Sequence, residues 1–146
     1  MSEELEEIGI IEKLLQTMKK VGKKKVINAL SELYDTKITN YDDSIISFIK
    51  EKVCESYKID PSGLNKSYLV DDFYISRNMI IVLIKKHLNI NHVTVSKIFG
   101  KKGHTLVSNA LSDFKNKNER IKEHRIYLEI YNQINLEVEE FKKKIQ

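Results

Sequence analysis

The chain has 146 residues and a formal net charge of +4 at pH 7, with 32% charged and 41% hydrophobic residues. That length suits one domain, or one small domain with helical extensions. No long apolar run without charges occurs, which excludes a membrane-spanning helix, and the acidic start, MSEELEEIGII, lacks the basic beginning of a signal peptide. The single cysteine, Cys54, excludes an internal disulfide and fits a reducing cytoplasm.

The spacing of apolar residues predicts an all-α protein. Only one proline and five glycines occur, and no segment alternates clearly between apolar and polar residues. The predicted helices follow in chain order: residues 2–20, 23–34, one beginning near 42, 76–88, 93–99, 104–116 and 119–144.

Local signals describe the first half of the chain. Five residues give the first helix an apolar stripe: Leu5, Ile8, Ile11, Leu15 and Met18. Asp42 or Asp43 is the expected N-cap of the helix that follows the linker at residues 35–41. Residues 60–63, Asp-Pro-Ser-Gly, have the composition of a turn, and residues 64–74 are expected to form a loop.

The segment from residue 76 to residue 114 carries the most informative pattern. Ser76 is expected to cap a long apolar helix, a short helix ends at Phe99, and another helix starts near His104. A basic turn with a glycine at each end, residues 100–103, joins the last two. Two helices joined by a short turn that contains glycine form a helix-turn-helix, whose second helix can lie in the DNA major groove.

Positive charge is concentrated in the same part of the chain. Residues 60–118 hold nine Lys or Arg against four Asp or Glu, whereas residues 119–146 hold six of each. Residues 1–22 are acidic, with three Lys and five Glu. A basic excess at the helix-turn-helix is the electrostatic pattern expected of a nucleic-acid-binding surface.

Residues 42–118 resemble the C-terminal DNA-binding domain of the bacterial replication initiator DnaA. That family has Arg-Gln at the opening of a long helix, Phe-Gly after a short one, and Asp-His-Thr-Thr at the start of the recognition helix, with an Ala one turn later. This chain has, in order, Arg77-Asn78, Phe99-Gly100, Gly103-His104-Thr105-Leu106 and Ala110. No phosphate-binding loop occurs in the 146 residues, so the resemblance does not extend to the family's ATPase domain.

The resemblance implies that the partner is double-stranded DNA. It implies that Arg77 contacts the DNA backbone and minor groove, and that His104 and Thr105 contact bases in the major groove. Asn78 stands where the family has Gln, and its amide can bond an adenine.

Position along the chain adds four more candidate DNA-binding residues. Lys101 and Lys102 lie in the turn beside the N-terminus of the recognition helix, where phosphates are favoured by charge and by free N–H groups. Ser108 and Asn109 lie one turn beyond His104 and Thr105, so they are expected to share the same exposed face.

The expected function is sequence-preferring binding of double-stranded DNA by a cytoplasmic regulator of transcription or an accessory protein of DNA replication, of bacterial, phage or mobile-element origin. No spacing of His, Cys, Ser or acidic residues predicts a metal site, a cofactor, a nucleotide site or an enzyme. The alternative is a protein-interaction module that keeps the fold and has lost DNA binding. Asp71-Asp72 favours that alternative, as does Ser112-Asp113, which stands where the family has a basic pair.

Three parts are predicted: an N-terminal helical extension (1–41), the DnaA-like domain (42–118) and a C-terminal amphipathic helix (119–146). Apolar residues repeat in that last helix at heptad spacing: Tyr127, Tyr131, Ile134, Val138, Phe141 and Ile145. We expect this seam either to pack on the N-terminal helix of its own chain or to pair with a second subunit. A homodimer through the C-terminal or the N-terminal helix would present two recognition helices to two DNA half-sites.

Overall fold

A computed structural model describes residues 3–27, 37–66 and 71–146 of the chain. It contains two compact units, Met1–Asp35 and Thr36–Gln146. All regular secondary structure in the described residues is helical, which confirms the all-α prediction. No helix among those residues is both long and apolar enough to cross a membrane.

The first unit contains α1 (Glu3–Val21) and a second helical stretch over residues 23–27. Gly22 separates them with a φ of +97°, a conformation that glycine adopts without strain. The first predicted helix is therefore present within a residue at each end. Residues 28–34 of the second predicted helix lie outside the described residues, as does the side chain of Leu5.

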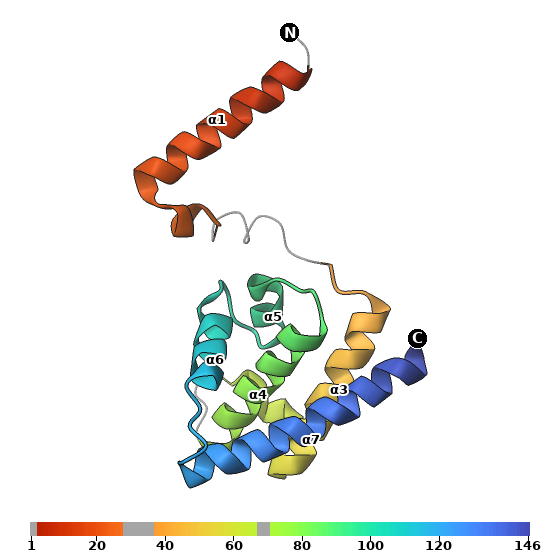
Figure 1. Cartoon of the computed structure of the whole chain (residues 1–146). Helices are drawn as coiled ribbons and strands as arrows, with labels where there is room; N and C mark the ends of the chain where they lie inside the picture. Colours follow the sequence, from red (N-terminus) through yellow and green to blue (C-terminus); the bar gives the residue numbers. More distant parts are fainter. Residues whose placement is uncertain (1–2, 28–36, 67–70) are drawn as a thin grey trace. The chain divides into compact units, whose positions relative to one another are not determined.

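The second unit is organised around α4 (Asp71–His87). This helix packs on α3 (Asn40–Tyr57) and on α6 (Thr105–Lys115), and Figure 1 shows it running through the middle of the unit. Its residues from 76 to 84 are all buried. An α-helix that is covered on every side needs no polar face, which explains the unbroken apolar run in this part of the sequence.

Two predicted N-caps are wrong. The N-cap of α3 is Thr39, whose hydroxyl accepts the Asp42 N–H at 3.1 Å, while the Asp42 carboxylate accepts the Thr39 N–H at 3.1 Å. This reciprocal pair is a capping box, so Asp42 stabilises the helix start from inside the first turn. Ser76 lies within α4 and is buried, because the helix begins five residues earlier, at Asp71.

The turn predicted at residues 60–63 is part of a short 3-10 helix, η1 (Pro61–Asn65). Asp60 caps it and accepts the Ser62 N–H at 2.9 Å. Gly63 lies against the Phe73 ring, and a Cβ at this position would lie 2.3 Å from a ring carbon. Residues 64–65 and 71–74 of the predicted loop are helical, because η1 ends at Asn65 and the next helix begins at Asp71. Residues 67–70 lie outside the described residues.

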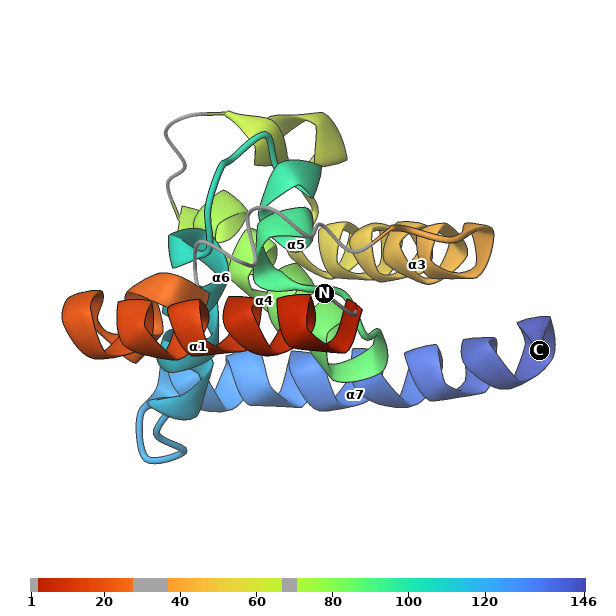
Figure 2. The same cartoon turned by 90° about the horizontal axis from the view of Figure 1, so that it is seen from above.

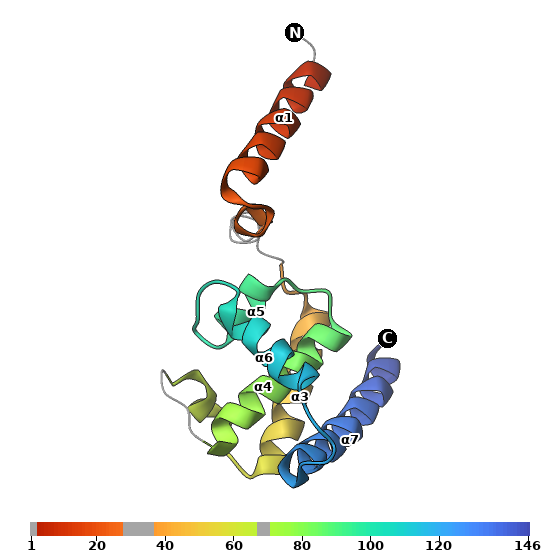
Figure 3. The same cartoon turned by 60° about the vertical axis from the view of Figure 1, so that its left-hand side comes forward.

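The last helix, α7 (Lys122–Ile145), packs along α3, as Figures 1 and 3 show. Four residues of its heptad seam are buried: Tyr127, Tyr131, Ile134 and Val138. Phe141 stacks on Phe48 of α3 with the ring centroids 4.2 Å apart, and Tyr131 lies 4.6 Å from the Phe114 ring of α6. The buried part of the seam thus packs on α3 and α6, which neither predicted alternative named, while Ile145 at its end is 38% exposed.

A buried histidine ties α7 to the central helix. His87, the last residue of α4, places its Nε2 atom 2.7 Å from the Asn135 side-chain oxygen. Its Nδ1 atom lies 3.4 Å from the Glu139 carboxylate. Figure 2 shows α7 passing beside the end of α4 in this unit.

Candidate nucleic-acid interface

The short helix α5 (His92–Ile98) has hydrogen-bonded caps at both ends. Asn91 caps its start. At its end, the Gly100 N–H donates to the Lys97 carbonyl and the Lys101 N–H donates to the Ser96 carbonyl, both at 3.0 Å. This pair of bonds is a Schellman motif, which requires a left-handed residue, and Gly100 supplies it with a φ of +70°.

The turn that follows places its two lysines before the recognition helix. Lys101 is half-buried and Lys102 is exposed, and Gly103 ends the turn with a φ of +76°. His104 is the N-cap of α6, and no side chain in the described residues makes a cap bond there. The first N–H groups of α6 therefore remain for solvent or for an anionic ligand.

The recognition helix α6 has one buried face and one polar face. Val107 and Ala110 are buried against the core, whereas Thr105, Ser108 and Asn109 are exposed. Figure 1 shows α6 at the left edge of the unit, beside α5. The predicted base-reading residues therefore share an accessible surface of the helix, with His104 half-buried at its start.

His92, the first residue of α5, lies near Lys85 of α4 and near His104 at the start of α6. Burial lowers the pKa of the His92 imidazole, and nearby Lys85 and His104 lower it further. The Lys85 ammonium is held in place because it donates a hydrogen bond to the Ile90 carbonyl. The lowered pKa favours the neutral form of His92, so the positive charge in these surroundings is that of the Lys85 ammonium.

Arg77 occupies an unusual position for a surface-binding residue, because it is only 8% exposed. Its guanidinium lies over the Tyr74 ring, 5.7 Å from the centroid, and its Nε atom is buried without a hydrogen-bond partner among the described residues. Burial lowers the pKa of this group. A buried charge that lacks a partner is costly unless a ligand supplies one.

Asn78 is also nearly buried, and a carboxylate of α6 engages it. Its side-chain amide donates to Asp113 Oδ2 at 3.3 Å, and the Tyr74 hydroxyl donates to the same oxygen at 3.2 Å. Sequence reasoning treated Asp113 only as a departure from the family's basic pair. The structure shows that it links the start of α4 to the end of α6, which no spacing rule indicates because the residues are 35 and 39 positions apart.

The predicted site residues therefore lie at both ends of α6. The lysines precede its N-terminus, and Arg77 and Asn78 lie near Asp113, two turns further along. From Thr105 to Asp113 the helix rises roughly 12 Å. The three exposed polar residues lie in the first half of this span, so the candidate interface follows the whole length of α6.

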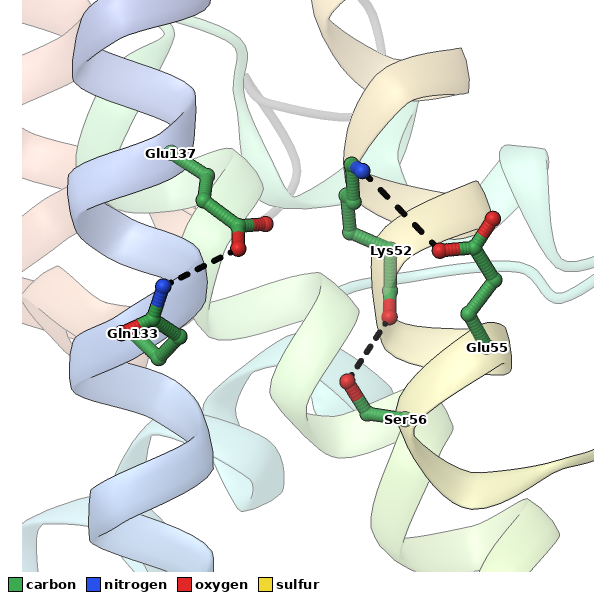
Figure 4. Close-up of polar contacts among 5 residues, drawn as sticks. All are labelled: Lys52, Glu55, Ser56, Gln133 and Glu137. Atoms are coloured by element: carbon green, nitrogen blue, oxygen red, sulfur yellow. Dashed lines mark hydrogen bonds and ion pairs between the residues drawn. The ribbon is translucent and has the colours of Figure 1, made fainter.

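A second surface feature lies between α3 and α7, where residues of both helices line a groove. Figure 4 shows Lys52 paired with Glu55 at 3.9 Å, and the Ser56 hydroxyl donating to the Lys52 carbonyl at 3.0 Å. On the other wall, the Gln133 amide donates to Glu137 at 3.1 Å. Each of these contacts joins residues of one helix, so the two walls of the groove meet through apolar packing.

Comparison with known proteins gives one match. Residues 46–113 match the family model described as the bacterial dnaA protein helix-turn-helix. That range runs from within α3 to the last turns of α6 and contains all eight candidate residues. No curated protein and no solved structure matches the chain. In the described residues, no group of His, Cys, Asp or Glu could hold a metal ion.

Proposed function

We propose that this protein binds double-stranded DNA with a preference for sequence, because residues 46–113 match the family model of the bacterial dnaA protein helix-turn-helix. The observation that carries the proposal is the exposed polar face of α6, directly preceded by a turn with two lysines. The major groove of B-DNA is about 12 Å wide and accepts one α-helix. In this arrangement α5 crosses the DNA backbone and α6 enters the groove.

The exposed residues of α6 suit direct reading of bases. Asn109 can bond the edge of an adenine, and Thr105 can place its methyl group against a thymine methyl. Ser108 both donates and accepts, so it discriminates less between bases. We propose that His104 and Thr105 contact the first bases and that Ser108 and Asn109 contact bases one turn further along.

Phosphate contacts supply most of the affinity in this proposal. Lys101 and Lys102 would hold one strand, together with the uncapped N–H groups at the start of α6. Arg77 would meet the backbone or the minor groove near the other end of α6. The Nε atom of Arg77 has no hydrogen-bond partner among the described residues, so a small movement of this side chain outward would let it pair with a phosphate.

We further propose a role as a bacterial or phage regulator or replication-accessory protein, which acts in the cytoplasm by occupying its DNA site. Site occupancy needs neither a nucleotide nor a cofactor. The 146 residues hold no phosphate-binding loop.

The test is fluorescence anisotropy with a pool of random duplexes at about 50 and 200 mM salt. Lys101→Glu combined with Lys102→Glu should abolish binding or weaken it strongly at both salt concentrations. Lys143→Glu combined with Lys144→Glu makes the same change in net charge at two exposed positions of α7, so it is the matched control. Equal effects of the two pairs would mean that only net charge matters, and would contradict the proposed interface.

The groove between α3 and α7 favours a second candidate function, a protein-interaction module without DNA binding. A neighbouring hollow between the same two helices is lined by Leu136, which is 63% exposed, and by Phe48 and Phe141. Salt separates the two functions, because affinity based on phosphate contacts falls steeply between about 50 and 200 mM salt. An apolar helix interface would change little over that range.

A further inference from the structure

The helix α1 exposes a stripe of apolar side chains. Ile8, Ile11 and Leu15 are 51%, 56% and 53% exposed, and Met18 is half-buried. Their spacing of three, four and three residues places them on one side of the helix, in the pattern of a short coiled-coil seam. Beyond α1, the described part of this unit is only residues 22–27, which are too few to cover a stripe of this length.

Charge is separated along the same segment. Residues 1–12 contain five Glu and no Lys or Arg, whereas residues 13–25 contain six Lys and no Asp or Glu. The order partly follows the helix dipole, which favours acidic residues at the N-terminus and basic residues at the C-terminus. It also decides how two such helices can pair. A parallel pair would set Glu beside Glu and Lys beside Lys, while an antiparallel pair sets opposite charges together.

We propose that α1 pairs with α1 of a second copy of this chain as an antiparallel two-helix coiled coil. One register satisfies both patterns. It sets Ile8 opposite Met18 and Ile11 opposite Leu15, so each apolar residue of the stripe meets another. The same register lays the acidic first half of each helix alongside the basic second half of the other.

Pairing through α1 gives the proposed DNA-binding function a consequence. A twofold dimer carries two recognition helices, which fit two half-sites related by symmetry. Linked sites bind more tightly than single ones when both can be occupied at once. This consequence rests on the proposed DNA binding, but the pairing itself does not, so the two are tested separately.

Sedimentation of the full chain without DNA tests the pairing. The wild type should be a dimer that dissociates on dilution, and Ile11→Glu combined with Leu15→Glu should be monomeric at all concentrations. Gln16→Glu combined with Thr17→Glu adds the same charges at exposed positions outside the stripe and should remain dimeric. Circular dichroism of both variants shows whether the helix content is retained.

A cross-linking experiment tests the orientation with substitutions that keep the stripe apolar. Ile8→Cys and Met18→Cys variants, whose side chains face each other in this register, are mixed and oxidised. A cross-linked dimer should form in the mixture and not in either variant alone. The native Cys54 is buried, so the wild-type chain serves as the background control.

Three outcomes would overturn the proposal. A wild-type monomer at all concentrations would mean that something else covers the stripe, such as another part of the same chain. A dimer that survives the Ile11 and Leu15 substitutions would move the interface elsewhere, for instance to the groove between α3 and α7. Cross-linking of either single-cysteine variant with itself would exclude the antiparallel orientation. If the wild type is monomeric and still binds DNA, the proposed DNA binding holds and only the pairing through α1 is excluded.

Discussion

Asn78 donates a hydrogen bond to Asp113, which places a carboxylate at the C-terminal end of the recognition helix. The bond joins α4 to α6 and keeps the Asn78 amide occupied in the absence of DNA. Asp113 is exposed, so in the proposed complex its negative charge would face the DNA phosphate backbone. The two effects oppose each other, because one orders the interface and the other repels its ligand.

Asp113→Asn should therefore tighten DNA binding. The substitution removes one negative charge and keeps a side-chain oxygen that can accept from Asn78 and from Tyr74. Exposed charges interact with about 0.2–1 kcal/mol, so we expect affinity to rise by about 1.4- to 5-fold at low salt. Anisotropy titrations at several salt concentrations measure this, and the gain should shrink as salt rises. Asp113→Ala removes the hydrogen bonds as well, and a loss of affinity in that variant alone would show that the link orders the interface.

The turn before α6 should be sensitive to a single methyl group. Gly100 has a φ of +70°, and a Cβ there would meet no atom within 4 Å. Gly100→Ala should therefore act through backbone strain alone and lower the free energy of unfolding by about 1 kcal/mol. Urea denaturation of the second unit measures the change. Gly9→Ala, within α1, is the control and should leave that transition in place.

The sequence alone predicts some features of this fold and not others. Apolar spacing predicted the helices well, because a helix must bury one face whatever covers it. The partner of the α7 seam was not predictable, since heptad spacing shows that a face is apolar and not which helix meets it. The early start of α4 was missed because Phe73 and Ile75 pack against the core, although the Asp71-Asp72 pair before them has the composition of a loop.

Some features of the candidate site could be predicted from the sequence, and others could not. Thr105, Ser108 and Asn109 lie on the exposed face that helical spacing predicts. The burial of Arg77 and Asn78 did not follow from the resemblance, because burial depends on tertiary packing between α4 and α6. A family motif identifies which side chains to examine, and the folded chain decides how accessible each one is.

The aromatic stack between α3 and α7 should contribute to the stability of the second unit. Phe141 and Phe48 lie with their rings 6° from parallel. Both are partly buried, so Phe141→Ala should lower the free energy of unfolding by about 1–3 kcal/mol, less than the cost at a fully buried position. Leu136→Ala on the same helix removes a mostly exposed side chain and should cost little. If both variants lose a comparable free energy of unfolding, the Leu136 side chain must also be buried, by a contact from outside this unit.

The stability of the second unit should fall as the pH decreases below about 6.5, the ordinary pKa of histidine. His87 has a side chain that is 1% exposed, and burial lowers the pKa of its imidazole. The hydrogen bond with Asn135 and the charge of Glu139 oppose this shift, while Lys142 and Lys86 reinforce it. Because the folded pKa lies below the unfolded one, the unfolded chain binds the proton more readily. The stabilisation is therefore complete above the unfolded pKa and is lost as the pH falls towards the folded one.

Urea denaturation at pH 7.5 and 5.5 measures this loss. His87→Gln keeps an amide that can donate to Asn135 and removes the titrating group, so the variant should lose less stability between the two pH values than the wild type. His92 has a lowered pKa as well, and His92→Gln shows how much of the pH dependence belongs to that residue. If the His87→Gln variant loses as much stability between pH 7.5 and 5.5 as the wild type, His87 is not the source of the pH dependence.

Substitutions of Asn109 and of Lys102 should change DNA binding in different ways. Both are exposed, one on the outer face of α6 and one in the turn before it. Asn109→Ala should relax the preference at one base position, by about 1–3 kcal/mol, with the salt dependence unchanged. Lys102→Ala should weaken binding to all sequences alike and lower the slope of log affinity against log salt by about one. Selection from a random duplex library, followed by titration of the selected site, measures both effects. If Asn109→Ala weakens binding to all sequences alike, the Asn109 side chain contacts the DNA phosphate backbone and not a base.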